Sequence, residues 1–162
     1  MIAARGLAFA LHVLSAVVWV GGMFFAYLCL RPSVGDLAAM QRAALWSRVL
    51  GRFFGWVLIA VPTLLLTGLW MSDWLADADL HIHLMLGLGV TMMLLFLHVY
   101  FAPFRRLRRA VAAGDAGASA RAIGQIRKLV AVNLALGLCV VLDATAGKYL
   151  LAYSMQSLAG GH

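Results

Sequence analysis

Histidine and aspartate side chains inside long apolar segments are the residues of this sequence most able to do chemistry. His12, His83 and Asp143 each lie in such a segment, where an ionisable group costs several kcal/mol unless it is paired. An imidazole can ligate a metal ion or haem iron, and a nearby carboxylate can orient that imidazole or relay a proton. Met23 adds a thioether, which suits Cu(I). We therefore predict His12 and His83 as metal or haem ligands and Met23 as an additional soft ligand. Asp143 is predicted as the carboxylate that orients an imidazole or relays a proton.

The apolar segments that carry these residues define the class of protein. Of 162 residues, 64% are hydrophobic and 12% are charged, whereas soluble domains are about 45–50% apolar and about 25% charged. Four segments, at about 6–30, 53–72, 82–103 and 129–151, have close to the ~20 residues that a helix needs to cross a bilayer. The sequence predicts an all-α, polytopic membrane four-helix bundle that forms a single domain over residues 1–162.

Basic residues are concentrated in two of the three connections between these segments. The connections 31–52 and 104–128 contain most of the arginines, whereas the connection between the second and third segments carries aspartates. By the positive-inside rule, the two basic connections are cytoplasmic and both termini are periplasmic, in a bacterial inner membrane. The net charge of +7 then reflects topology and contact with the lipid bilayer, and we expect no nucleic-acid partner.

Helical periodicity assigns the polar and small residues to one face of each segment. At 100° per residue, His12, Trp19, Gly22 and Met23 share a face of the first segment. The corresponding residues of the later segments are Arg52, Thr67 and Trp70 in the second, His83, Gly87, Thr91 and His98 in the third, and Asn133 and Asp143 in the fourth. We expect these faces to meet in a polar seam, with a pocket lined by Trp19, Gly22, Thr67, Trp70 and Gly87.

Depth along the helices separates two candidate sites. With a rise of 1.5 Å per residue, His12 lies about 9 Å below the outer end of its helix and Asp143 about 10 Å below the outer end of its own. His83 stands at the outer start of the third segment, so these three groups share the outer half of the bundle. His98 lies roughly 22 Å deeper than His83. It belongs to a second candidate site on the cytoplasmic side, together with Arg52.

Each of these residues also has a plain structural interpretation. The His12 ring can be satisfied by a group on a neighbouring helix, and Asp143 can have a structural role. Most methionines in apolar segments serve packing, and Met85 and Met92 lie on the face opposite His83.

Several stretches resemble known membrane families. Leu11 to Leu14 and Val18 to Phe24, then Arg52-Phe53-Phe54, Thr67 to Trp70, His81 to Met85 and Phe104 to Leu107 resemble the CopD family of bacterial copper-resistance proteins. This resemblance implies copper handling or transport, with a periplasmic copper carrier as a partner and a homo-oligomer as a further expectation.

The same pattern is similar to the HemJ family, four-helix membrane proteins with protoporphyrinogen oxidase activity that are thought to bind haem b. The activity of that family depends on a histidine in the first helix, and this resemblance assigns that role to His12. The family has a lysine near the start of the third helix, and this sequence has His83 or Met85 near that position. The alternative prediction is a haem b oxidoreductase, so the cofactor stays open between a copper ion and haem b.

Overall fold

The structure, a computed structural model, describes residues 2–71 and 80–147, and these residues form four long helical runs. The first run joins α1 (Ile2–Ala16), α2 (Gly22–Phe24) and α3 (Arg31–Ser33) through two π-helical segments, η1 (Val17–Gly21) and η2 (Phe25–Leu30). The second run is the single helix α4 (Ala39–Met71). The third joins α5 (Leu80–Val99), the π-helical η4 (Tyr100–Phe104) and α6 (Arg105–Ala112), and the fourth joins α7 (Ala116–Leu142) and the π-helical η5 (Asp143–Gly147).

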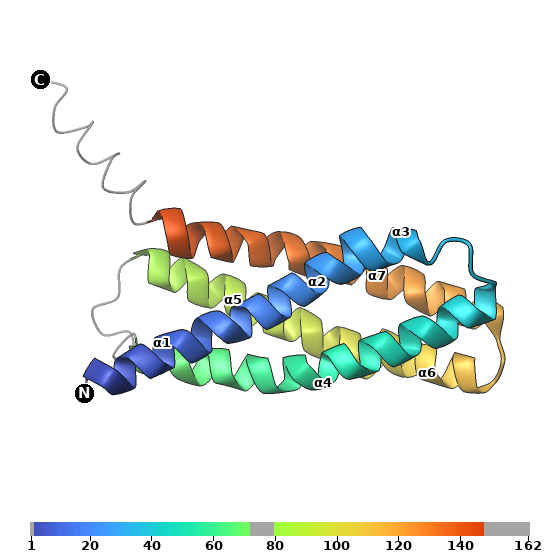
Figure 1. Ribbon diagram of the computed structural model, residues 1–162, viewed down its shortest axis with the longest axis horizontal. Helices are drawn as coiled ribbons and strands as arrows, with labels where there is room; N and C mark the ends of the chain where they lie inside the picture. The colour runs from blue at the N-terminus through green and yellow to red at the C-terminus, as the bar shows by residue number, and fades with distance from the viewer. Residues whose placement is uncertain (1, 72–79, 148–162) are drawn as a thin grey trace, which may run out of the picture.

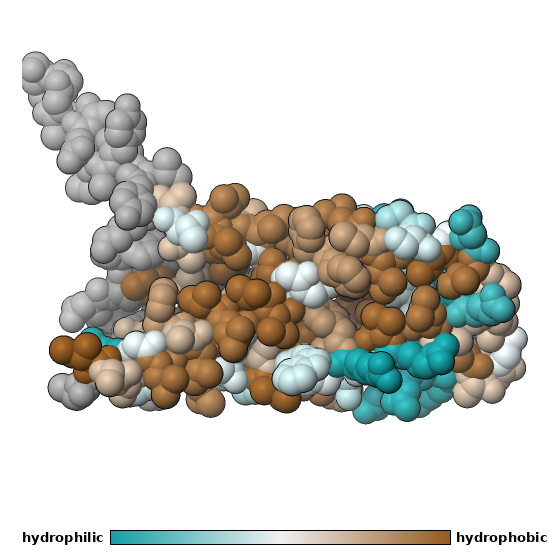
Figure 2. Space-filling model, in the orientation of Figure 1, coloured by the Kyte–Doolittle hydropathy of each residue, from teal (hydrophilic) through white to brown (hydrophobic). Residues whose placement is uncertain are grey.

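The runs are long and apolar enough to cross a membrane, which confirms the predicted all-helical membrane fold. Each contains a candidate span within 31 to 33 helical residues. At 1.5 Å per residue that is about 48 Å, longer than a hydrocarbon core of about 30 Å. Large apolar side chains such as Val17, Trp56 and Leu94 are more than 60% exposed, as expected of a surface that faces lipid. Figure 2 shows this apolar surface over most of the bundle.

The helices continue well into the two basic connections. Most of residues 31–52 and 104–128 lie in α3, α4, α6 and α7. Their apolar residues recur at helical spacing among the arginines, so Leu50, Leu107 and Ile126 are buried while most of the arginines are exposed. The aspartates of the second connection, Asp73, Asp77 and Asp79, lie outside the described residues.

The four runs lie side by side in one bundle (Figure 1). The start of α1, the start of α5 and the end of α7 lie at one end of the bundle, and the 34–38 connection and the turn between α6 and α7 lie at the other. In that turn Gly114 has a φ of 68°, a value that glycine adopts without strain. The Asp115 carboxylate then accepts a hydrogen bond of 2.8 Å from the Ala118 amide and caps α7. Hydrophilic residues gather at this second, basic end (Figure 2).

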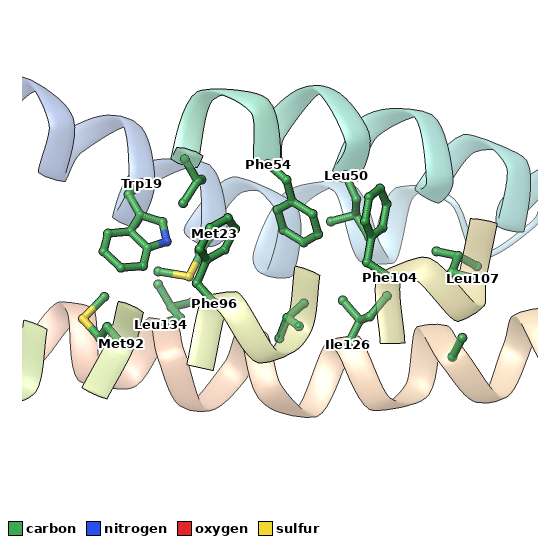
Figure 3. Close-up of a cluster of buried hydrophobic side chains, with 13 residues drawn as sticks. Trp19, Met23, Leu50, Phe54, Met92, Phe96, Phe104, Leu107, Ile126 and Leu134 are labelled. Carbon is green, nitrogen blue, oxygen red and sulfur yellow. The ribbon is translucent and has the colours of Figure 1, made fainter. Parts of the chain in front are cut away.

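A buried cluster of apolar and aromatic side chains holds the runs together (Figure 3). Phe54 of α4 is at its centre, with its ring centroid 4.9 Å from that of Phe104 and 5.5 Å from that of Phe96, in edge-to-face arrangements. Trp19 packs edge-on to Phe96 at 6.2 Å. This aromatic packing lies on the side of Trp19 toward the basic end. The half of the bundle around His12 contains a cavity.

Candidate metal site

His12 lies on the inner face of α1 and lines a cavity of about 110 Å³ between α1, α4, α5 and α7. The face predicted for the first segment is confirmed, because Trp19 and Met23 are buried there and the His12 side chain is half-buried. His12 Nδ1 lies 2.9 Å from the Thr67 hydroxyl oxygen of α4. A water occupies about 30 Å³ in the liquid, so the cavity has room for a metal ion with a few waters.

The hydrogen bonds of Thr67 favour one of the two tautomers of the His12 imidazole. The Thr67 hydroxyl donates to the Thr63 carbonyl oxygen at 2.6 Å, and a carbonyl can only accept. The hydroxyl has one proton, so while it donates to Thr63 its oxygen can only accept from His12 Nδ1–H. A neutral imidazole with its proton on Nδ1 has a lone pair on Nε2, the nitrogen that is available to a metal ion.

Gly68 packs against the imidazole ring of His12. A Cβ atom placed on Gly68 would lie 3.2 Å from His12 Cε1. The ring is therefore held between the Thr67 hydroxyl and the backbone of Gly68, two consecutive residues of α4. The sequence predicted Thr67 as a pocket residue, and the structure gives it a direct contact with His12.

Thioether side chains from α5 form part of the opposite wall of the cavity. Met85, Met92 and Met93 line it, as does Trp19 from η1. Gly137 of α7 allows close packing there, since a Cβ at that position would lie 3.0 Å from Met92 Cε. The sequence predicts Met85 and Met92 as packing residues, and their seven-residue spacing is the signal that they share one helix face.

Met23 lies deeper in the bundle than His12, and its surroundings include a buried amide. It is 2% exposed and belongs to the same buried cluster as Met92 (Figure 3). Asn133 Nδ2 of α7 lies 3.6 Å from Met23 Sδ. Asn133 Oδ1 is buried and has no hydrogen-bond partner within the described part of the chain. Met23 does not line the His12 cavity.

His83 does not line the cavity either, contrary to the grouping predicted from depth. His83, Gly87, Thr91 and His98 are all exposed, so the polar face of α5 points out of the bundle and the methionine face points in. The physical reason is visible at Thr91, whose hydroxyl donates to the Gly87 carbonyl of its own helix at 2.8 Å. A threonine satisfied in this way needs no partner from another helix.

Asp143 begins η5 at the end of α7, next to two cavity-lining residues, Val140 and Val141. The side chain is half-buried and does not itself line the cavity. Its Oδ2 atom is buried and has no hydrogen-bond partner among residues 2–71 and 80–147.

The remaining predicted site residues have other positions. A Cβ on Gly22 would overlap the Phe53 ring, so Gly22 serves close packing of η1 and α2 against α4. Trp70 is 50% exposed and contributes with Thr67 to a shallow outer groove. Arg52 and His98 are both exposed, and no hydrogen bond joins their side chains. The second candidate site is thus not assembled among the described residues.

The cavity offers a particular set of donors. Within residues 2–71 and 80–147, no group of three His, Cys, Asp or Glu side chains is close enough to hold a metal ion. A site here has one imidazole nitrogen and the thioethers of the cavity wall. Soft sulfur donors with an imidazole suit Cu(I) better than they suit Zn²⁺, Mg²⁺ or Ca²⁺.

The fold and the cavity together define an integral membrane protein with four candidate spans and an intramembrane cavity containing histidine and methionine. The family model described as copper resistance protein D (CopD) matches residues 47–147, more than half of the chain, and the chain belongs to the CopD family. The match includes Thr67, Met85 and Asp143 and begins after His12 and Met23. A search of curated proteins and a search of solved structures each found no match. The matched description names copper, and no comparison points to haem.

Proposed function

We propose that this protein binds copper as Cu(I) in the His12 cavity and aids its movement across the membrane. The observation that carries the proposal is the hydrogen bond between His12 Nδ1 and Thr67, which leaves Nε2 unprotonated in a cavity lined by methionines. Membership of a copper-resistance family supports copper as the cargo.

The ligands we assign are His12 Nε2 and the Met85 sulfur, with Met92 as the next sulfur along α5. Neutral thioether and imidazole ligands hold Cu(I) through its softness, without a negatively charged residue that would itself be costly to bury. The bound state then carries a single positive charge. Asp143, which follows the cavity-lining Val140 and Val141 on the same helical run, offsets that charge with its carboxylate. His83 is not part of this ligand set.

A series of sulfur atoms marks a path for copper through the bundle. Met85 and Met92 are two helical turns apart on α5, about 10 Å, and Met92 and Met23 belong to the same buried cluster. Copper would pass between the cavity and the region of Met23 and Asn133. Beyond Met23, the aromatic cluster around Phe54 has to move before copper can reach the basic end.

We place the His12 end of the bundle on the periplasmic side, because the basic end carries the arginines of both long connections. Both termini are then periplasmic, and a periplasmic copper carrier delivers or receives the ion. A tag at the N-terminus should be accessible to protease in spheroplasts of a bacterial host. Protection of that tag, with cleavage only after lysis, would invert the orientation.

The binding proposal is tested by competition for Cu(I) between the detergent-purified protein and a chromogenic chelator under reducing conditions. We expect one tightly held Cu(I) per chain. His12→Ala should weaken binding at least tenfold, and Met85→Leu, which conserves side-chain volume, should weaken it as well. Met40→Leu is the matched control, because Met40 lies near the start of α4 and does not line the cavity.

Two outcomes would overturn the copper proposal. One is a protein that takes up no Cu(I), and the other is His12→Ala protein that binds Cu(I) as tightly as the unaltered chain. A Soret band in the purified protein that is lost in His12→Ala would favour the haem b alternative instead.

A further inference from the structure

A second cavity, of about 390 Å³, lies at the basic end of the bundle. It is formed by the end of the first helical run, the 34–38 connection, the first turns of α4 and the N-terminal half of α7. It shares no lining residue with the His12 cavity, and the copper proposal does not use it.

Three arginines line this cavity, Arg31, Arg42 and Arg127, and among residues 2–71 and 80–147 no acidic side chain lines it. Arg42 Nη1 donates to the Gly35 carbonyl at 3.2 Å, which holds the guanidinium in place and leaves its other N–H groups available. The Arg31 guanidinium lies over the Tyr27 ring, 5.1 Å from its centroid. Three cationic groups with no carboxylate among them form a site for an anion, and guanidinium donors match phosphate oxygens in geometry.

The rest of the cavity wall is apolar. Val34, Leu50 and Ile126 line it and are at most 5% exposed. Tyr27 and Trp46, which also line it, are of the types enriched where a membrane meets water. A small soluble anion would need the arginines but not this wall, whereas an amphipathic ligand uses both.

The position of the cavity along the helices agrees with an amphipathic ligand. The helical runs exceed the hydrocarbon thickness by many ångströms, and the hydrophilic residues gather at the basic end (Figure 2). This end therefore reaches the level of the lipid headgroups. Basic pockets between transmembrane helices are known to hold anionic headgroups.

We propose that this second cavity is a binding site for one anionic phospholipid. The phosphate contacts Arg42 and Arg127, with Arg31 held close by Tyr27. One acyl chain lies along the apolar wall next to Trp46. The lipid thereby joins the first helical run to α4 and α7, which form the three sides of the cavity.

Quenching of tryptophan fluorescence by brominated phospholipids tests this site in the purified, delipidated full chain. Phosphatidylglycerol with brominated acyl chains should quench in a saturable way at a lower mole fraction than the matching phosphatidylcholine. The saturable part should disappear in Trp46→Phe. Equal quenching by the two lipids would overturn the proposal.

Arginine variants separate the contribution of the positive charges to phospholipid binding from general effects on the protein. Arg42→Gln and Arg127→Gln should each raise the half-saturating mole fraction of phosphatidylglycerol about fivefold, because a basic residue at an anionic surface contributes about that factor. Arg127 is exposed, so its replacement leaves the core intact. Arg42→Lys, which keeps the positive charge, should retain part of the binding that Arg42→Gln loses. Arg108→Gln is the control, because Arg108 is an exposed residue of α6 outside the cavity.

A free anion is distinguished from a lipid by competition with inorganic phosphate. If millimolar inorganic phosphate removes the saturable quenching completely, the cavity is a site for a soluble anion and the lipid proposal is wrong. If inorganic phosphate reduces the saturable quenching only in part, the acyl chain contributes to binding, and the lipid proposal is supported. Arg108→Gln weakening binding as much as Arg127→Gln would also overturn the proposal.

Discussion

His12 Nδ1 lies 2.9 Å from Thr67 Oγ1, and this hydrogen bond joins α1 to α4 inside the membrane-spanning bundle. The Thr67 hydroxyl donates a hydrogen bond to the Thr63 carbonyl, which favours the imidazole with its proton on Nδ1. Thr67, 55 positions along the chain, thus orients the His12 ring in the cavity. The metal affinity of a site with a ligand oriented in this way depends on the hydrogen-bond partner nearly as much as on the ligand.

Removal of the Thr67 hydroxyl should weaken copper binding without unfolding the protein. In Thr67→Val the Nδ1–H group of His12 loses its acceptor, and the ring can adopt the other tautomer. We expect Cu(I) affinity to fall 10–100-fold, with about 1 kcal/mol lost from stability. Thr67→Ser keeps the hydroxyl and should bind nearly as well as the unaltered chain. Equal affinity in the valine and serine variants would contradict this role of Thr67.

Added bulk at Gly68 should displace the imidazole. In Gly68→Ala the new methyl would lie 3.2 Å from His12 Cε1, closer than ordinary van der Waals contact. The ring must shift, and we expect a loss of Cu(I) affinity of about tenfold, of the size seen when outer-shell support is lost. Gly55→Ala is the control on the same helix, because a Cβ there meets nothing within 4 Å. An affinity change of the same size in both variants would show a general effect of α4.

The fold was predictable from the sequence because apolar length is a strong physical constraint. A segment of about 20 apolar residues has few options in a membrane other than a helix. The helix ends were less predictable. Leu107 is fully buried although it stands between Arg106 and Arg108, and only the packing of α6 against α7 shows that this basic stretch is part of the core.

The site was predictable only in part, because polarity alone does not say which face of a helix is inward. On α1 the rule worked, since His12 finds a partner on α4. On α5 the polar face points outward, and the Thr91 hydroxyl is satisfied within its own helix. The methionine face carries no group that demands a partner, so the sequence predicts it only as packing.

The two histidines predicted as ligands should therefore differ in their effect on copper binding. His83 is exposed and outside the cavity, whereas His12 lines it. We expect His83→Ala to change the dissociation constant for Cu(I) by less than about twofold and His12→Ala to raise it at least about tenfold, as loss of a direct ligand requires. Chelator competition measures both. A large effect of His83→Ala would instead support the ligand pair predicted from the sequence.

Close packing at Gly22 should be required for stability and not for copper binding. A Cβ on Gly22 would overlap the Phe53 ring, so Gly22→Ala must separate the first helical run from α4 or turn the ring. Overpacking of this kind costs about 1–3 kcal/mol. The neighbouring Gly21→Ala is the matched control, because its Cβ meets nothing within 4 Å. Thermal unfolding in detergent should show a lower midpoint for Gly22→Ala alone, and equal midpoints would contradict the role of this contact.

The buried amide of Asn133 allows a test that separates copper passage from protein stability. Asn133 Oδ1 is buried without a hydrogen-bond partner in the described part of the chain, and Nδ2 makes only a 3.6 Å contact with Met23 Sδ. A protein with an apolar residue of similar size at this position should fold at least as well, since an unpaired polar group costs about 1–3 kcal/mol.

If copper passes Met23 and Asn133, Asn133→Leu should slow copper uptake into proteoliposomes while Cu(I) binding at His12 is retained. Gln125→Leu, which replaces an exposed amide of α7, is the control and should leave uptake unchanged. Uptake at the normal rate by a stable Asn133→Leu protein would mean that copper does not pass this amide, and the path from Met92 to Met23 would be wrong.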